Sequence, residues 1–157
     1  MHQPTDSRPL ALPAVAEAYG YAGMAPFLLA ALGTGLLPDV EARDWAQRLA
    51  VGYGAAILAF VGAVHWGLAL AGRLPNTLAV YAGSILPSVA ATVAVVLGGQ
   101  RGLALLVVSF GLFWLYEAQR LAAELPPDYL RLRRNLSLAV CALLALTMII
   151  SDSVGLP

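Results

Sequence analysis

The stretch AQRLAVGYGAAILAFVGAVHWGLALAG, from Ala46 to Gly72, decides the fold class of this chain. A helix needs about 20 mostly apolar residues to cross a hydrocarbon core of about 30 Å, and this run meets that length. The run also carries His65 well inside its apolar sequence. An imidazole within a membrane span favours a functional interpretation, because polar groups in hydrocarbon are costly.

The composition indicates the same class for the whole chain. Its 157 residues are 60% hydrophobic and only 11% charged, and the mean hydropathy is +0.77. Soluble domains contain about 25% charged residues, so we expect an integral membrane protein. The nine basic residues balance the nine acidic ones, and this balance gives no indication of a nucleic-acid partner.

Further apolar runs complete an all-α bundle of five transmembrane helices. We expect a cytoplasmic tail over 1–13 and a single transmembrane domain over 14–157, with spans at about 14–37, 46–72, 77–98, 103–121 and 136–151. The fifth run is short. We therefore expect its helix to extend back into the arginine-rich segment before it, with the arginine side chains reaching the interface.

Five spans place the two termini on opposite sides of the membrane, and the arginines predict which side is which. Six of them fall on the side of the amino terminus, and three, Arg43, Arg48 and Arg101, fall on the other. Because cytoplasmic segments carry the excess of basic residues, we expect the amino terminus inside and the carboxyl terminus outside. The predicted location is the bacterial cytoplasmic membrane.

Ionisable residues gather in the inner half of this predicted bundle. Glu17, His65 and Glu117 lie on three different spans at a similar depth, and Tyr81 enters its own span at the same level. Two interpretations are open. In the first, Glu117 pairs with Arg120 or with an arginine of the 131–134 segment, and His65 bonds to a hydroxyl or carboxylate group. In the second, His65 is the titrating group of a proton or ligand site between the two glutamates.

The sequence contains no set of residues typical of catalysis or of a metal site. His2 and His65 are its only histidines and Cys141 its only cysteine, whereas zinc and copper sites take several such ligands. A haem would need two copies of His65 in a symmetric dimer, or a methionine such as Met24. We therefore expect no metal, no cofactor and no enzymatic activity.

Two further sets of residues suggest contacts with lipid and with other helices. Small residues recur every four positions along the second span and would allow another helix to approach closely: Ala55, Ala59, Ala63 and Gly67. Basic residues near the inner surface either set the topology or bind anionic lipid headgroups: Arg120, Arg131, Arg133 and Arg134.

Four segments together resemble a known family of membrane proteins. They are YGYAGMAPFL from Tyr19, YGAAILAFVGAVHWGLAL from Tyr53, YAGSILPSVAA from Tyr81 and YLRLRRNLSLAV from Tyr129. The resemblance is to domain of unknown function 3429, a multi-pass family of bacterial inner membranes and mitochondria that includes the mitochondrial transmembrane protein sixty-nine. It implies that His65 and Trp66 matter together, and it brings no catalytic residue, cofactor or substrate to this chain.

These observations lead to two functional hypotheses. The first is a non-enzymatic accessory or assembly subunit that packs against other membrane proteins, or against itself, through its small-residue stripe. The alternative is a small transporter or proton-coupled ligand-binding protein that uses the Glu17, His65 and Glu117 cluster. In both, the partners are the lipid bilayer and membrane proteins.

Overall fold

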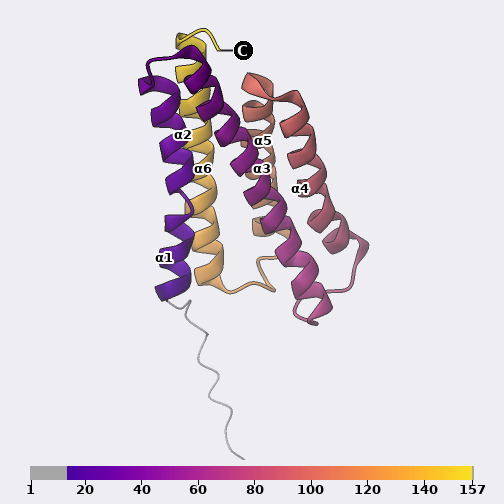
Figure 1. Cartoon of the computed structure of the whole chain (residues 1–157). Helices are drawn as coiled ribbons and strands as arrows, with labels where there is room; N and C mark the ends of the chain where they lie inside the picture. Colours follow the sequence, from indigo (N-terminus) through magenta and orange to yellow (C-terminus); the bar gives the residue numbers. More distant parts are fainter. Residues whose placement is uncertain (1–13, 157) are drawn as a thin grey trace, which may run out of the picture.

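The computed structural model describes residues 14–156, and these form an all-α bundle (Figure 1). Its helices are α1 (Ala14–Ala22), α2 (Ala25–Leu36), α3 (Val40–Leu70), α4 (Leu78–Leu97), α5 (Gly99–Arg120) and α6 (Pro127–Ser153). Helices α1 and α2 follow each other along one path, so the described chain has five stretches long and apolar enough to cross a membrane. The expected all-α architecture is confirmed, while the expected tail over 1–13 lies outside the described residues.

Helix α3 is the centre of the bundle. It packs against α4, α2 and α5, while α6 packs against α5 and α2, and α1 lies against α6. The start of α1 and the α3–α4 and α5–α6 connections lie at one end of the bundle, which we call the α1 end (Figure 1). The α2–α3 and α4–α5 connections lie at the opposite end.

Two helix boundaries differ from those expected and a third confirms an expectation, each for a local reason. The first span breaks at Gly23 and Met24, because Pro26 in the first turn of α2 has no N–H to donate. Helix α3 begins at Val40 rather than near 46, since its first turns are polar and project beyond the apolar run. Helix α6 begins at Pro127, a residue suited to a first helical position, so the expected extension through the arginine segment is confirmed.

Two glycines allow the helices around α4 to approach closely. A Cβ on Gly62 of α3 would lie 2.7 Å from the carbonyl oxygen of Ser84 on α4. A Cβ on Gly102 of α5 would lie 2.5 Å from the carbonyl oxygen of Ala94 on α4. Only glycine fits at both positions, so backbone contact holds α4 between α3 and α5.

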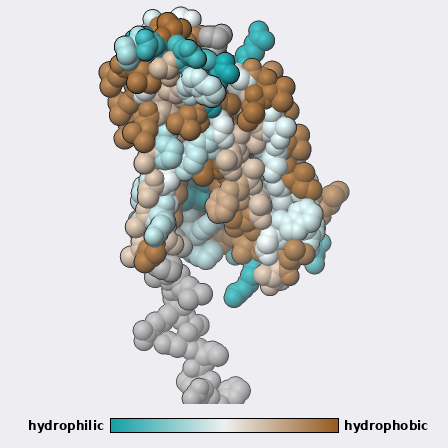
Figure 2. Space-filling view, viewed as in Figure 1, coloured by the Kyte–Doolittle hydropathy of each residue, from teal (hydrophilic) through white to brown (hydrophobic). Residues whose placement is uncertain are grey.

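The middle of the bundle has an apolar core, and its flanks are apolar too. The large buried side chains of the core come from α2, α3, α5 and α6, while α4 contributes small ones: Phe27, Leu58, Leu103, Leu106, Phe110, Leu144, Ala91 and Ala94. On the outside, hydrophobic residues cover much of the visible flank, while strongly hydrophilic ones gather near the two ends (Figure 2). Such a surface is expected of a protein whose flank contacts lipid.

Candidate functional site

The site is built around Glu117, which lies on the inner face of α5 three residues before the helix ends. Phe110, Phe113 and Glu117 recur at helical spacing and are all buried, so the carboxylate follows two aromatic residues on the same face. The side chain of Glu117 is fully buried. A buried carboxylate of this kind is stable only with a partner of opposite charge or with hydrogen-bond donors.

Arg133 of α6 supplies that charge. Its Nε donates to Glu117 Oε2 at 3.1 Å and to Oε1 at 3.4 Å, and the arginine side chain is itself only 9% exposed. The guanidinium carbon also lies 5.7 Å from the centre of the Phe113 ring, a distance at which a cation is attracted to the aromatic face. The expected pairing of Glu117 with an arginine of the 131–134 segment is therefore present.

His65 approaches the same carboxylate from α3. Its Nε2 lies 3.3 Å from Glu117 Oε1, within the range of an ion pair but without the geometry of a hydrogen bond. The imidazole is fully buried and stands edge-on to Phe113, with ring centres 5.2 Å apart. Neither of its nitrogens has a hydrogen-bond partner among residues 14–156. His65 is therefore held mainly by packing, with Nε2 turned towards the carboxylate of Glu117.

Tyr129 completes the group from the first turn of α6. Its hydroxyl donates to Glu117 Oε1 at 3.5 Å, at the long limit of a hydrogen bond. Helices α3 and α6 thus direct polar side chains at the carboxylate of α5, and we call Glu117, His65, Arg133 and Tyr129 the Glu117 centre. It lies near the α1 end: His65 is five residues from the end of α3, or about 8 Å at 1.5 Å per residue.

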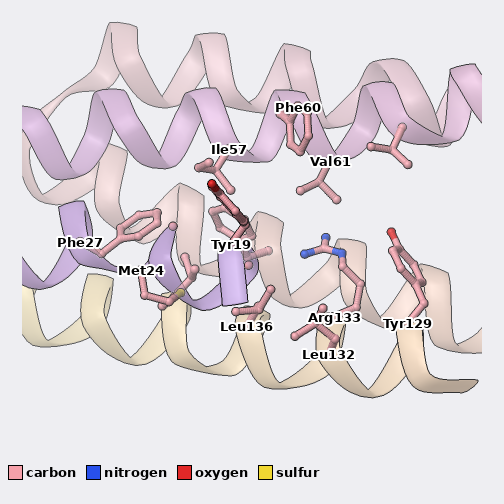
Figure 3. Close-up of a pocket in the computed structure, with 15 residues that line it drawn as sticks. Tyr19, Met24, Phe27, Ile57, Phe60, Val61, Tyr129, Leu132, Arg133 and Leu136 are labelled. Carbon is pink, nitrogen blue, oxygen red and sulfur yellow. The ribbon is translucent and has the colours of Figure 1, made fainter. Parts of the chain in front are cut away.

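An elongated cavity of about 260 Å³ adjoins this centre, and its wall comes from α1, α2, α3, α5 and α6. Figure 3 shows Tyr129 and Arg133 at one end of the cavity and Met24 and Phe27 at the other. In the space-filling view, a hollow on the same side of the molecule has hydrophilic residues at its floor (Figure 2). The cavity therefore joins a polar group near the end of the bundle to an apolar region near its middle.

The break between α1 and α2 shapes one wall of this cavity. Gly20 and Gly23, on either side of the last turn of α1, line it and contribute no side chain. The hydroxyl of Tyr53 on α3 donates to the Gly23 carbonyl oxygen at 3.1 Å, which gives a partner to a carbonyl at the break. Tyr53 thereby fixes the end of α1 beside the cavity.

The other residues expected in a polar cluster lie elsewhere. Glu17 is exposed on α1, and the structure does not bring it to His65 or Glu117, because α1 packs against α6 rather than α3 or α5. Trp66 follows His65 by one residue, so it points about 100° away around the helix. It is 42% exposed and packs edge-on against Tyr81, with ring centres 5.1 Å apart. The Tyr81 hydroxyl donates to Asn76 Oδ1 at 2.5 Å, outside the Glu117 centre.

The basic residues separate into one buried side chain and three exposed ones. Arg120, Arg131 and Arg134 are exposed at the α1 end, and Arg131 pairs with Asp128 on the same helix. That these three residues set the topology or bind lipid headgroups stays a prediction. Arg133, which the sequence groups with them, instead faces the interior.

The small-residue stripe of α3 is only partly used inside the bundle. Ala55 is buried and Ala59 half-buried, whereas Ala63 and Gly67 are exposed. A Cβ on Gly67 would meet no atom within 4 Å. The close approach of α4 occurs instead at Gly62, one position from Ala63, because the buried face of α3 runs through Leu58 and His65.

Sequence reasoning left open which arginine pairs with Glu117, and it did not name Tyr129 as a member of this site. Helical spacing could have indicated both residues. Tyr129, Arg133 and Ser137 recur every four residues on α6, and their face continues through the buried Val140 and Leu144. As for metal ions, residues 14–156 hold no group of three His, Cys, Asp or Glu side chains arranged to bind one.

A comparison with protein families gives one match, which covers residues 12–149. The family is described as Protein of unknown function (DUF3429). The chain belongs to this family. Comparisons with curated proteins and with solved structures give no match. The matched residues run from just before α1 to near the end of α6. All four residues of the Glu117 centre therefore lie within the part of the chain that matches the family.

Proposed function

We propose that this member of the family is a non-enzymatic membrane protein that binds a small ligand from the bilayer at the Glu117 centre. The observation that carries the proposal is a fully buried carboxylate held by groups from two other helices, beside a cavity. An ionised group in a membrane span is costly, and such groups mark binding sites and ion pathways. The charge of Glu117 is already balanced by Arg133, which favours binding over catalysis by a free base.

The rest of the interior favours binding over conduction. A polar hollow of about 710 Å³ lies at the opposite end of the bundle, with Asp44, Arg48 and Arg101 in its wall. Between this hollow and the Glu117 centre lies the apolar core, where Leu58, Leu106 and Leu144 are fully buried. An ion would have to cross that layer without a polar partner, which is unfavourable.

The proposal includes a link between ligand binding and protonation of His65. The titratable and charged side chains around the imidazole are Glu117 and Tyr116 from α5 and Arg133 and Tyr129 from α6. With a neutral imidazole, Glu117 and Arg133 cancel; a proton on His65 gives the centre one positive charge. Histidine is the side chain that most often changes charge between about pH 5 and 8.

Histidine NMR tests the proposal, because the sequence has only two histidines. In a His2→Gln variant labelled with ¹⁵N-histidine, every imidazole signal belongs to His65. We expect the signal of delipidated protein to shift when bacterial lipid extract is added, and we expect the protonation state of His65, read from its ¹⁵N shifts, to differ with and without lipid. The matched control is Arg134→Gln, which leaves the centre intact. An identical signal with and without lipid extract would refute binding at this centre.

We further propose the bacterial cytoplasmic membrane as the location, with the α1 end in the cytoplasm. The support is the arginine count, since Arg73, Arg120, Arg131, Arg133 and Arg134 lie towards the α1 end and three arginines lie towards the other. Single cysteines in a Cys141→Ser background test the orientation in intact cells. An impermeant maleimide should label Glu41→Cys and spare Ala123→Cys; the reverse pattern would overturn the orientation.

The second candidate function is an accessory subunit that packs against another membrane protein. The observation that favours it is the exposed half of the small-residue stripe, where Gly67 has open space around it. Replacing Gly67 by leucine should release a co-purifying protein in mild detergent, whereas Gly52→Leu, at another glycine with open space, should retain it. Purification as a lone monomer would rule this candidate out.

A further inference from the structure

We infer that the cavity beside the Glu117 centre holds one uncharged amphiphile with a single chain and a carbonyl head. Its carbonyl oxygen accepts a hydrogen bond from Arg133 Nη2, and its chain lies along Met24 and Phe27. The inference rests on the proposed ligand-binding function and adds the chemical class of the ligand.

The first argument is an unused donor on a buried charge. Arg133 contacts Glu117 through Nε alone, and Nη2 is buried without a hydrogen-bond partner among residues 14–156. In a bidentate pair, the arginine would donate to the carboxylate through both Nε and Nη2. Nη2 would then already have an acceptor. A buried, charged N–H group without an acceptor is unfavourable, so a ligand oxygen at this position gains more than it would at an exposed arginine. Figure 3 shows the guanidinium of Arg133 within the ring of cavity residues.

The second argument is the polarity of the cavity along its length. Arg133 and Tyr129 line it near the α1 end, and Val140 lines it further along α6. The seven residues from Arg133 to Val140 correspond to about 10 Å of helix. An amphiphile in a membrane has the same arrangement, with its head towards the interface and its chain towards the middle. The cavity therefore matches the orientation that such a molecule already has in the bilayer.

The third argument is charge. Glu117 and Arg133 cancel, so an uncharged carbonyl adds a hydrogen bond without adding a buried charge. A carboxylate would leave the pair with an excess negative charge away from water, which is costly unless His65 also takes a proton. A cationic head would face the guanidinium of Arg133 and be repelled. The centre thus favours a neutral ketone or ester over a fatty acid anion or an amine.

The fourth argument is size and access. A cavity of about 260 Å³ exceeds the roughly 150 Å³ that accommodates benzene, and its elongated form suits part of one chain rather than a whole phospholipid. Tyr19 and Phe60 line the cavity and are 77% and 66% exposed on the flank. The cavity wall is thus exposed on the apolar flank at these two residues, and the proposed ligand enters there, sideways from the bilayer.

Equilibrium binding of tritiated methyl dodecanoate to the purified full chain in detergent micelles tests the inference. Wild type should bind about one molecule per chain. Arg133→Lys keeps a positive charge opposite Glu117 but removes the guanidinium donors, and it should weaken binding about tenfold or more. The matched control is the exposed neighbour, Arg134→Lys, which should bind as wild type does.

A second pair of variants keeps the test valid if Arg133→Lys does not fold. Val64 is half-buried in the cavity wall, so Val64→Phe fills the cavity without altering the Glu117 centre. It should also weaken binding about tenfold or more, whereas Val108→Phe, on the outside of α5, should not. Wild-type affinity in Val64→Phe would overturn the assignment to this cavity.

Competing probes of matched chain length test the head group. Tridecane should compete at least about tenfold less well than unlabelled methyl dodecanoate, because it lacks the acceptor. Dodecanoate, tested at alkaline pH, and dodecylamine should also compete less well. Equal competition by tridecane, or stronger competition by dodecanoate, would overturn the inference, as would the absence of saturable binding to wild type.

The proposed proton link can fail separately. If the ester binds wild type and its binding is lost in the Val64→Phe and Arg133→Lys variants, the ligand class stands even when His65 has the same protonation state with and without ligand. If the His65 signal responds to lipid extract but the ester does not bind, the proposed function stands and this inference fails.

Discussion

Removing the charge of Arg133 should destabilise the bundle far more than removing any exposed arginine. Arg133→Met leaves Glu117 fully buried and opposed only by the His65 imidazole, whose Nε2 is 3.3 Å away. Breaking a buried ion pair by removing one partner typically costs about 3–5 kcal/mol. We therefore expect Arg133→Met to lose at least about 3 kcal/mol of unfolding free energy.

Replacing both partners separates the ion pair from simple packing. In Glu117→Leu with Arg133→Met, no buried charge is left without a partner, and such exchanges are often neutral or stabilising by about 1–4 kcal/mol. The double variant should therefore unfold near wild type or later, although each single variant unfolds earlier. Arg134→Met, at the exposed neighbouring position, should match wild type.

The assay is reversible unfolding in mixed micelles, with sodium dodecyl sulfate as the denaturant and helical circular dichroism as the signal. The cycle of wild type, two single variants and the double variant gives the coupling between the two side chains. A loss below about 1 kcal/mol for Arg133→Met, the value of an exposed pair, would refute the buried position of this ion pair.

Other substitutions test the packing of the bundle by the same unfolding assay. Gly62→Ala should lower the free energy of unfolding by about 1–3 kcal/mol, because its Cβ would lie 2.7 Å from a carbonyl oxygen of α4. Gly67→Ala, with open space around it, should be neutral or stabilising by up to about 1 kcal/mol. Equal effects of the two variants would contradict the α3–α4 contact. Tyr53→Phe removes the bond to the Gly23 carbonyl and should cost about 1 kcal/mol, with faster amide exchange confined to α1; unchanged exchange would contradict that role. Arg131→Gln breaks an exposed pair and should cost less than about 1 kcal/mol, so a larger loss would point to a buried Arg131.

The number of possible membrane spans could be predicted from the sequence, because apolar length is a direct physical requirement for crossing a bilayer. The run around His65 and the four others reappear as helices long enough to span a membrane. The extension of α6 to Pro127 was also predictable, since the apolar run after Leu136 is too short by itself. The start of α3 and the break before α2 could not be predicted. Whether polar residues continue a helix, and whether a proline interrupts one, depends on the neighbouring helices.

The site was only partly predictable, because depth in the membrane is visible in a sequence but direction around a helix is not. Glu17 shares the depth of His65 and Glu117, yet α1 lies against α6 and leaves Glu17 exposed. Arg133 was grouped with its exposed neighbours, although its spacing from Tyr129 and Val140 places it on the buried face of α6. Hydropathy alone does not distinguish an arginine at the interface from one inside the bundle.

Arg133 lies about two turns from the start of α6, so the ligand proposed above would have its head near the α1 end and would enter from the monolayer on that side. In vesicles with randomly oriented protein, a ligand added outside would reach half of the copies at once. It would reach the other half only at the rate of its own flip-flop across the membrane. The binding time course should therefore show two phases of equal amplitude. For a molecule that flips rapidly across the membrane, the two phases should merge into one.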